Sequence, residues 1–566
     1  MLKVLLVEQL KDKNMKEYSK ILIMLFIATL FLLSSCKTNC KKDKTDPYAG
    51  PYGKRIEEDL ISTNIIEDNY RNYYEIFVRS FNDSNMDLIG DLNGVTNKLD
   101  YIKDLGYNGI WLMPINPSSS YHKYDVNNYY DVDPSYGTLE DLKNLIKECH
   151  NRGIKLIIDL VLNHSGKANP YFSKACSAYD KYLKGMTLTE EEEKYKDFYV
   201  FYPNQASVPN GITAYKAGSN YNFYYEGNFS SNMPEFNCDS EAVKAEFKNI
   251  MKFYLDLGID GFRLDAVKYF YFTNHSKSIN FLKWINTTVK EIKPDAYIVG
   301  ECYDGYDLIS RYYDSGIDSF FNFSTSVSYA SQSGVINGVN PEGRGMNLYY
   351  NSLISNYNIG KGQGIPAPFI DNHDMPRYTY QSSIEKNKFT FGLLAMMNGT
   401  IFSYYGDEVG LYGTNQGTSG VDQNVRIPIQ WGDFSNMDCS VINGVTSKFY
   451  PYPTVKEQIE DSNSILNYYK KVLLLRNQNP EIARGTIELI AKEKEDKKML
   501  FISKTYNNSK IGIIFNFSDY ENMTIDYKSY GFTQVVGQAV INSSYYVGEQ
   551  KDGSIIIPPF SIVILK

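Results

Sequence analysis

The chain has 566 residues, a formal net charge of −8 and an aromatic content of 15%. This length exceeds what one ordinary hydrophobic core needs, so a large domain with appended or inserted parts is expected. The acidic balance, with no basic block in the body of the chain, argues against binding to nucleic acid. The seven cysteines include no Cys-x-x-Cys pair, which argues against a structural zinc site or a disulfide scaffold.

The N-terminus has the features of an export signal. Lysines precede an apolar run from Ile21 to Leu33, which suits the core of a secretion signal and is too short to span a bilayer stably. The run ends in Leu-Ser-Ser-Cys, which resembles the lipobox of bacterial lipoproteins, where the cysteine (here Cys36) is lipidated. We predict a signal peptide over 1–36, export across the inner membrane, and lipid anchoring in the periplasm or on the cell surface.

Short apolar runs alternate with segments of helical period between about residues 70 and 480. Several runs are continuously apolar, as parallel strands buried on both faces are. The predicted strands are Tyr73–Val78, Gly109–Met113, Lys155–Leu162, Gly261–Asp265, Tyr297–Gly300, Ser319–Phe321, Pro368–Ile370 and Thr400–Tyr404. Helices are expected between them, for example over 139–152 and 240–257. Eight such units predict an α/β fold, a (β/α)8 (TIM) barrel.

Two segments depart from this alternation. A long polar stretch rich in Tyr and Asn follows the third strand and predicts an inserted subdomain, and short β-type runs after about residue 485 predict a C-terminal all-β sandwich. The predicted organisation is a linker and lead-in over 37–69, the first part of the barrel over 70–164, the inserted subdomain over 165–237, the second part of the barrel over 238–484, and the β-domain over 485–566.

Polar residues stand where four of the predicted strands end. These motifs are Asp-Leu-Val-Leu-Asn-His at 159–164, Gly-Phe-Arg-Leu-Asp at 261–265, Ile-Val-Gly-Glu at 298–301 and Phe-Ile-Asp-Asn-His-Asp at 369–374. The carboxyl ends of barrel strands converge on one mouth, so these side chains are expected to meet there. A single motif of this kind can be a cap or a loop charge, but four in order at strand ends indicate an active site.

Together the four motifs resemble the signature regions of the α-amylase family of glycoside hydrolases, over roughly residues 70–566. The resemblance implies an enzyme that cleaves α-glucans or maltooligosaccharides and needs no organic cofactor. It implies that Asp265 is the nucleophile, Glu301 the general acid/base, and Asp374 a third carboxylate that binds sugar hydroxyls. The residues that it implies for substrate binding are Tyr124, Asp125, His164, Arg263, Lys268, His373 and Arg377.

The chemistry explains why paired carboxyl groups are needed. Acetal cleavage passes through an oxocarbenium-like state, and two carboxyl groups about 5–5.5 Å apart can retain the anomeric configuration through a covalent intermediate. Glu301 must stay protonated near neutral pH, so its pKa must be raised by burial or by neighbouring negative charge. Arg263 lies two residues from Asp265 on the same strand and faces the same way, so it can keep the nucleophile ionised.

A further motif, Asp-Ser-Asn-Met-Asp-Leu-Ile-Gly-Asp, follows the first strand. Its alternating oxygen-bearing side chains resemble the first half of a calcium loop, and the family implies an ion site there. The predicted calcium ligands are Asp83, Asn85, Asp87, Ile89 and Asp91. Leu88 stands where a glycine is common and would crowd the turn, so an ion-free Asn/Asp-rich turn is the alternative. Asn163 is a candidate ligand of a second calcium.

Other residues bear on which bonds are cut. Met-Pro-Glu-Phe-Asn at 233–237 resembles a segment of neopullulanase-type enzymes, and Ala266 after the nucleophile resembles enzymes that cut α-1,4 bonds. Tyr269 stands where a histidine commonly follows the substrate-binding lysine. We expect an α-1,4-glucan hydrolase that cuts within chains.

Three alternatives remain open. The segment 425–431 resembles oligosaccharide α-glucosidases, and Asp125 with Arg377 could close one end of the pocket and favour exo cutting. A related transferase is the second alternative. A surface glucan-binding protein without activity is the third, but it would require the loss of a catalytic carboxylate, and all three carboxylates are present.

Overall fold

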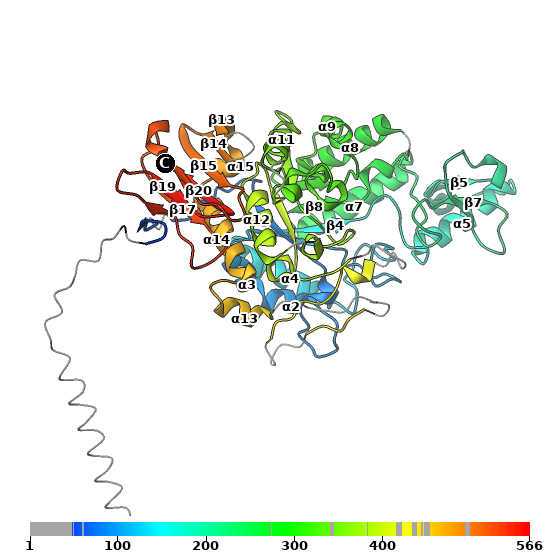
Figure 1. Ribbon diagram of the computed structural model, residues 1–566. Coiled ribbons are helices and arrows are strands. Elements are labelled where there is room, and N and C mark those ends of the chain that lie inside the picture. Colours follow the sequence, from blue (N-terminus) through cyan, green and yellow to red (C-terminus); the bar gives the residue numbers. More distant parts are fainter. Residues whose placement is uncertain are drawn as a thin grey trace, which may run out of the picture.

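The computed structural model describes residues 48, 50–58, 62–272, 274–339, 345–381, 383–414, 422–432, 438–442, 445, 453–492 and 498–566. The predicted signal peptide and Cys36 lie outside these residues. The C-terminal β-domain lies on one side of a central barrel, and the segment inserted after the third barrel strand lies on the opposite side (Figure 1).

Eight parallel strands form the central sheet in the order β11-β10-β9-β8-β4-β3-β2-β12. A parallel bridge between Phe369 and Phe402 joins the two outer strands and brings the sheet close to full closure. The strands are β2 (Asn72–Ile76), β3 (Gly109–Leu112), β4 (Lys155–Leu160), β8 (Gly261–Leu264), β9 (Tyr297–Gly300), β10 (Ser319–Asn322), β11 (Ile365–Pro368) and β12 (Ile401–Tyr404). The predicted (β/α)8 barrel is confirmed.

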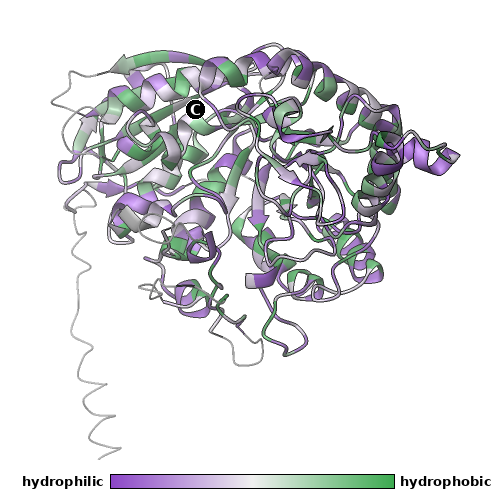
Figure 2. Cartoon of the chain, turned by 90° about the vertical axis from the view of Figure 1, so that its right-hand side faces the viewer, coloured by the Kyte–Doolittle hydropathy of each residue, from purple (hydrophilic) through white to green (hydrophobic). Residues whose placement is uncertain are grey.

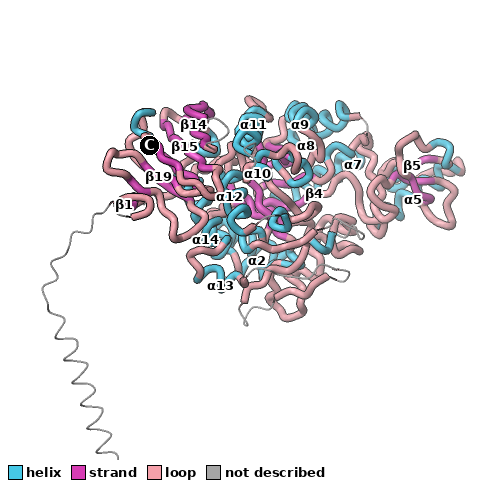
Figure 3. Tube along the Cα trace, viewed as in Figure 1, coloured by secondary structure: helices cyan, strands magenta, loops and turns pink. Residues whose placement is uncertain are grey.

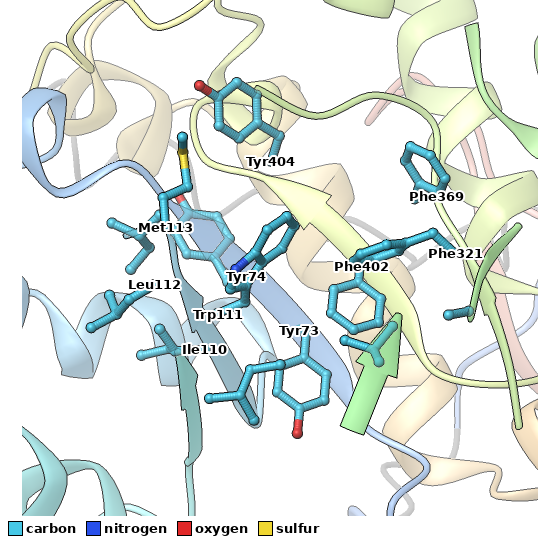
Figure 4. Close-up of a cluster of buried hydrophobic side chains, with 14 of the residues drawn as sticks. Tyr73, Tyr74, Ile110, Trp111, Leu112, Met113, Phe321, Phe369, Phe402 and Tyr404 are labelled. Carbon is cyan, nitrogen blue, oxygen red and sulfur yellow. The ribbon is translucent and has the colours of Figure 1, made fainter. Parts of the chain in front are cut away.

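Aromatic side chains fill the barrel interior. The ring of Tyr73 stacks on Phe402 at 4.9 Å and on Tyr297 at 5.4 Å, and Trp111 contacts Phe321 at 5.4 Å. Figure 4 shows the side chains of Tyr73, Trp111, Phe321 and Phe402 gathered inside the barrel, although they come from four different strands. Stacked and edge-to-face rings fill the space between strands and make the barrel a solid core that supports the residues at its mouth.

The seventh strand differs from its predicted position. It covers Ile365–Pro368, whereas the sequence predicted Pro368–Ile370. The main chain of Phe369 is bound instead by the hydroxyl of Thr325, which donates to its carbonyl at 2.8 Å, and the carbonyl of Ile370 accepts from the amide of Val327. The regular ladder between β10 and β11 therefore ends at Pro368, and Phe369 keeps only the single bridge to Phe402.

Helices surround the strands (Figure 3), and their bands of hydrophobic and hydrophilic residues are visible in Figure 2. A capping box of Thr138 and Asp141 begins α4, and Gly258 in the left-handed region (φ 106°) ends α7. The barrel helices are α2 (Leu92–Asn97), α3 (Leu99–Leu105), α4 (Leu139–Asn151), α7 (Glu241–Leu257), α8 (His275–Ile292), α9 (Tyr306–Tyr312), α10 (Gly334–Asn337), α11 (Gly345–Asn358), α12 (Ile384–Ala395), α13 (Val455–Glu460), α14 (Ile465–Gln478) and α15 (Glu481–Arg484).

The segment between β4 and α7 has a small fold of its own. It contains α5 (Pro170–Leu183), α6 (Glu190–Tyr195) and a three-stranded antiparallel sheet of β5 (Phe201–Tyr202), β7 (Tyr224–Glu226) and β6 (Ala214–Lys216). An antiparallel bridge between His164 and Glu235 ties its last residues to the end of β4. The segment is therefore attached to the barrel beside the motif that follows the third strand.

The C-terminal domain consists of two antiparallel sheets. One is β13-β14-β15-β20-β17 and the other is β1-β18-β19-β16, where β1 (Lys54–Arg55) comes from the N-terminal lead-in. Apolar residues of both sheets form one buried cluster, so the sheets pack face to face as a sandwich. The other strands are β13 (Thr486–Lys492), β14 (Met499–Tyr506), β15 (Ser509–Asn516), β16 (Met523–Ile525), β17 (Val535–Ala539), β18 (Gly548–Glu549), β19 (Ile555–Ile557) and β20 (Ser561–Leu565).

Two negative findings apply to the described part of the chain. None of its helices has the length and apolar character needed to cross a membrane. Its five cysteines are all buried and unpaired; they are Cys149, Cys176, Cys238, Cys302 and Cys439.

Candidate active site

Arg263 lies at the centre of the charged residues at the barrel mouth. Its fully buried guanidinium pairs with Asp265 at 2.7 Å and with Asp159 at 2.9 Å through Nη1, and with Glu301 at 2.9 Å through Nη2. The strand that carries it begins at Gly261, where an added Cβ would lie 1.8 Å from the carbonyl oxygen of Tyr297. Because one planar guanidinium holds both Asp265 and Glu301, these two carboxyl groups lie within a few ångströms of each other.

The environment of Glu301 suits a proton donor. Its Oε2 accepts a hydrogen bond from the amide of Ala266 at 3.0 Å, next to Asp265 in the chain. Burial raises the pKa of Glu301 to about 7; the negative charges of Asp265 and Asp374 act in the same direction, and Arg263 opposes them. A carboxyl group with this pKa is protonated in a large fraction of molecules at neutral pH, as the sequence required.

Asp374 sits between two cations. Its Oδ2 is 3.0 Å from Nε2 of His373, and its Oδ1 is 2.8 Å from Nη2 of Arg426. Burial alone would lower the pKa of His373, but Asp374 and Glu75 raise it to about 10, so the ring is charged at neutral pH. Loss of water opposes the ionisation of Asp374, yet His373 and Arg426 hold its pKa well below the usual value. Asp374 is therefore ionised. Its side chain is 42% exposed to solvent, so a ligand can reach it.

Tyr124 links the two groups of charges. Its hydroxyl donates to Oδ2 of Asp159 at 3.0 Å and lies 2.7 Å from Nε2 of His373. Asp125 is buried behind it and accepts hydrogen bonds from the hydroxyls of Ser118, at 2.5 Å, and Ser120. Tyr124 thus belongs to the cluster of charged side chains, while Asp125 fixes the loop that carries Tyr124.

His164 lies near Asp265, while Lys268 is held by the residues that follow Glu301. Neither ring nitrogen of the buried His164 has a well-formed hydrogen bond among the described residues. The nearby main chain of Tyr124 acts to raise the pKa of the ring, but burial has the larger effect. Burial lowers the pKa of His164, so the ring is neutral at neutral pH and can both donate to and accept from a ligand. Lys268 donates to the carbonyl of Tyr303 at 2.6 Å and to Asp304 at 3.2 Å.

Arg377 lies outside this cluster. Its guanidinium is fully buried, pairs with Asp407 at 2.7 Å and donates to the carbonyls of Tyr405 and Val425. It therefore cannot close one end of the pocket together with Asp125 as the sequence suggested. The arginine that reaches Asp374 is Arg426, which lies in the segment 425–431 that resembles oligosaccharide α-glucosidases.

Two further residues belong to the cluster: Glu75, which the sequence did not point to, and Asp159, which begins one of the four motifs but was given no role. Glu75 lies in the first barrel strand and binds Nδ1 of His373 at 2.5 Å, and Asp159 pairs with Arg263. Both are buried within strands of otherwise apolar character. A charged residue inside a strand that is buried on both faces is a usable signal, because such a charge needs a partner.

The loop predicted to bind calcium is a series of short turns. Asp83 accepts hydrogen bonds from the amides of Asn85 at 2.9 Å and of Leu88 at 2.6 Å, and Asp91 accepts from the amide of Ser84 at 2.9 Å. Leu88 adopts φ 70°, the left-handed conformation of a glycine, with its side chain 47% exposed, so leucine does not prevent the turn.

The oxygen atoms of this loop are of the kinds that bind Ca²⁺, but its carboxylates alone do not form a site. Within the described residues, no group of three or more His, Cys, Asp or Glu side chains is arranged to hold a metal. A site here would therefore need the amide oxygen of Asn85 and the main-chain oxygen of Ile89 in addition to the carboxylates. Oxygen ligands of this mixed kind are those that Ca²⁺ prefers.

Two carboxyl groups on one arginine, one of them with a raised pKa, form the site of a carboxylate-dependent hydrolase. Residues 75–485 match the family model for the alpha amylase catalytic domain. The chain is 34% identical to Alpha-amylase 3 of Dictyoglomus thermophilum over 88% of this chain and 93% of that protein. It is 28% identical to an oligo-1,6-glucosidase of Parageobacillus thermoglucosidasius over 79% of this chain and 89% of that protein. The chain belongs to the α-amylase family and is a glycoside hydrolase.

Solved structures agree with this assignment. Eubacterium rectale Amy13B matches with a TM-score of 0.80 at 38% sequence identity, over 90% of this chain and 99% of that one. An α-amylase from H. orenii matches with a TM-score of 0.70 at 29% identity, over 88% and 99%. The relatives differ in their named activities, so they do not identify the bond that this enzyme cuts.

Proposed function

We propose that this enzyme hydrolyses α-1,4-glucosidic bonds in starch-like α-glucans and maltooligosaccharides with retention of anomeric configuration. The observation that carries the proposal is the arrangement in which Arg263 holds Asp265 and Glu301 together while the pKa of Glu301 is raised to about 7. Two carboxyl groups that share one guanidinium suit direct attack by one of them, as in retaining enzymes, whose carboxyl groups lie about 5–5.5 Å apart.

The proposed reaction has two displacements. In the first, a carboxylate oxygen of Asp265 attacks the anomeric carbon while Glu301 gives its proton to the glycosidic oxygen, and the bond to the leaving sugar breaks. In the second, Glu301 takes a proton from water, the water oxygen attacks the same carbon, and the bond to Asp265 breaks. Asp374, kept ionised by His373 and Arg426, binds sugar hydroxyls throughout.

The choice of the α-1,4 bond rests on two observations. Ala266 follows the nucleophile, as in enzymes that cut α-1,4 bonds, and the Dictyoglomus relative is named an α-amylase. The second candidate is an exo-acting oligo-1,6- or α-glucosidase, which is favoured by the name of the Parageobacillus relative. The position of Arg377, buried against Asp407, removes one argument for exo cutting.

Product analysis tests the proposal. The protein is incubated with amylose, pullulan, maltotriose and isomaltose in the presence of calcium, and the products are separated over time. We expect a spread of maltooligosaccharides from amylose, with the α-anomer formed first. Glucose alone, released from maltotriose or isomaltose while amylose stays nearly intact, would establish the exo-acting alternative instead. An initial β-anomer would contradict retention.

We also propose that the 83–91 loop binds a structural calcium ion through Asp83, Asn85, Asp87, Ile89 and Asp91. When bound, the ion neutralises the clustered carboxylates and fixes the loop that follows β2. The loop is tied to a distant segment, since the carbonyl of Leu88 accepts from the amide and hydroxyl of Ser440 at 2.8 and 3.0 Å. We therefore expect a bound ion to stabilise the fold and to take no part in the reaction.

Removal of calcium is expected to lower the Tm. If calcium is present at about 100 times its Kd, chelation with EDTA should lower the Tm by about 3 °C, and added calcium should restore it. The Asp83→Ala variant should show the lower Tm with or without calcium. Asp552→Ala, which removes a turn carboxylate of the C-terminal domain, should keep the full response. A wild-type Tm that is indifferent to EDTA would establish the ion-free turn.

Lipid anchoring through Cys36 remains our proposal for the location of the enzyme. It rests on the apolar run from Ile21 to Leu33 and on the Leu-Ser-Ser-Cys sequence that ends it. An enzyme held in this way outside the cytoplasm would meet polymeric glucan before uptake.

A further inference from the structure

The loop that carries Tyr124 contains a buried lysine in an unusual main-chain conformation. Lys123 has a φ of 66°, in the left-handed region, and only 8% of its surface is exposed. A residue with a Cβ atom is disfavoured in this conformation, and burial of an amine adds a second cost. Contacts made by the lysine must offset both costs, because the turn would otherwise relax.

The partner of this lysine is a buried carboxylate, Asp133. Nζ of Lys123 lies 2.7 Å from its Oδ2, which also accepts from the amide of Ser118 at 3.3 Å. Its Oδ1 accepts from the amide and the hydroxyl of Ser135 at 3.0 and 2.6 Å. Burial opposes the ionisation of Asp133, but the hydrogen bonds from Lys123 and Ser135 outweigh it and lower the pKa. One charged carboxylate therefore ties together three points of the loop.

The residue that follows Lys123 is Tyr124. The two side chains bind separate groups, since the amine of Lys123 is on Asp133 whereas the hydroxyl of Tyr124 is on Asp159 and His373. The left-handed φ of Lys123 sets the direction in which the chain continues into Tyr124. The ion pair that holds Lys123 therefore also fixes where the ring of Tyr124 lies.

We propose that Lys123, through its ion pair with Asp133, is a positioning residue that holds Tyr124 in the active site, an inference that rests on the proposed function. Glycine would adopt this turn without a steric cost, so the reason for a lysine lies in its side chain. The amine is held by Asp133 and lies 5.2 Å from the centre of the Tyr136 ring. We therefore expect Lys123 to act through Tyr124 and not by binding the substrate itself.

The Lys123→Gly variant separates positioning from stability. Glycine relieves the left-handed strain, which offsets part of the stability lost with the ion pair, so the Tm should stay within about 3 °C of wild type. The turn is then free to move, and kcat/KM on maltopentaose should fall by about tenfold or more, because small displacements in an active site are costly.

Lys498→Gly is the matched control. Lys498 also has a left-handed φ, of 54°, and its amine lies 3.6 Å from Asp519, but it belongs to the C-terminal domain. The same chemical change there should leave kcat/KM unchanged. An unchanged kcat/KM in Lys123→Gly as well would overturn the inference.

A double-mutant cycle identifies the residue through which Lys123 acts. Tyr124→Ala should lower kcat/KM by about 100-fold, and Lys123→Gly added to it should change this by at most about twofold, since no ring remains to be positioned. Losses that multiply in the double variant would overturn the inference. If Lys123→Gly does not fold, Asp133→Asn, which removes the charge but keeps the shape, takes its place in the cycle.

The cycle also distinguishes this inference from the proposed function. Wild-type enzyme that cleaves isomaltose and leaves maltopentaose intact would overturn the proposed α-1,4 activity. The cycle is then measured on isomaltose, where the same non-additive loss supports the positioning role and multiplying losses overturn it.

Discussion

Replacing Asp265 with asparagine is expected to lower kcat on amylose by about 10⁴-fold or more. Asparagine has nearly the same shape, but its amide cannot form the covalent ester that the proposed mechanism requires. The fold should survive, because Arg263 keeps its ion pairs with Asp159 and Glu301. The measurement is kcat on amylose, together with a Tm within about 2 °C of wild type.

Asp256→Asn provides the matched control for this variant. Asp256 has an exposed side chain near the end of α7 and pairs with Lys252 at 2.7 Å, so its loss should leave kcat unchanged. A second measurement identifies the nucleophile directly. A slow fluorinated glycosyl fluoride should add one sugar to the wild-type protein, and mass spectrometry should place it on Asp265. A label on any other carboxylate would contradict the assignment.

The barrel could be predicted from the sequence because its strands are buried on both faces. Continuous apolar runs such as Leu156-Ile157-Ile158 have few alternatives, and the polar residue after each run marks the mouth. The boundaries were less predictable where a side chain captures the main chain. The hydroxyl of Thr325 binds the main chain of Phe369. Thr325 lies in a loop that is distant in the sequence, so the residues around 365–370 do not predict this contact.

The three carboxylates, Arg263 and His373 were also predictable, since each stands in a motif at a strand end. The roles of Arg377 and Arg426 were not. Arg377 follows the fourth motif closely, yet it pairs with Asp407, whereas Arg426 reaches Asp374 from 52 residues away. Both arginines are buried and both need an acidic partner, so only the packing of the loops decides which carboxylate each one meets.

Replacing Glu301 with glutamine is expected to lower kcat on amylose by about 10²- to 10⁴-fold, the range for loss of a general acid and base. The loss should depend on the leaving group. Fluoride needs no proton to depart, so α-maltosyl fluoride should still react with Asp265 in a rapid first step, followed by slow hydrolysis. The measurement is a burst of fluoride equal to the amount of enzyme, which amylose cannot give. An equal loss on both substrates would contradict the role of Glu301.

The pH dependence follows from the same group. The first step requires protonated Glu301, whose pKa is about 7, so kcat/KM of the wild type on maltopentaose should fall as the pH rises through 7. On α-maltosyl fluoride, where the first step needs no proton, kcat/KM should not fall in this range, and the same should hold for Glu301→Gln. Because Asp374 and Asp265 help to raise this pKa, neutralising Asp374 as Asp374→Asn should move the fall in the residual activity to lower pH. A fall that stays at the same pH in Glu301→Gln would assign it to another group.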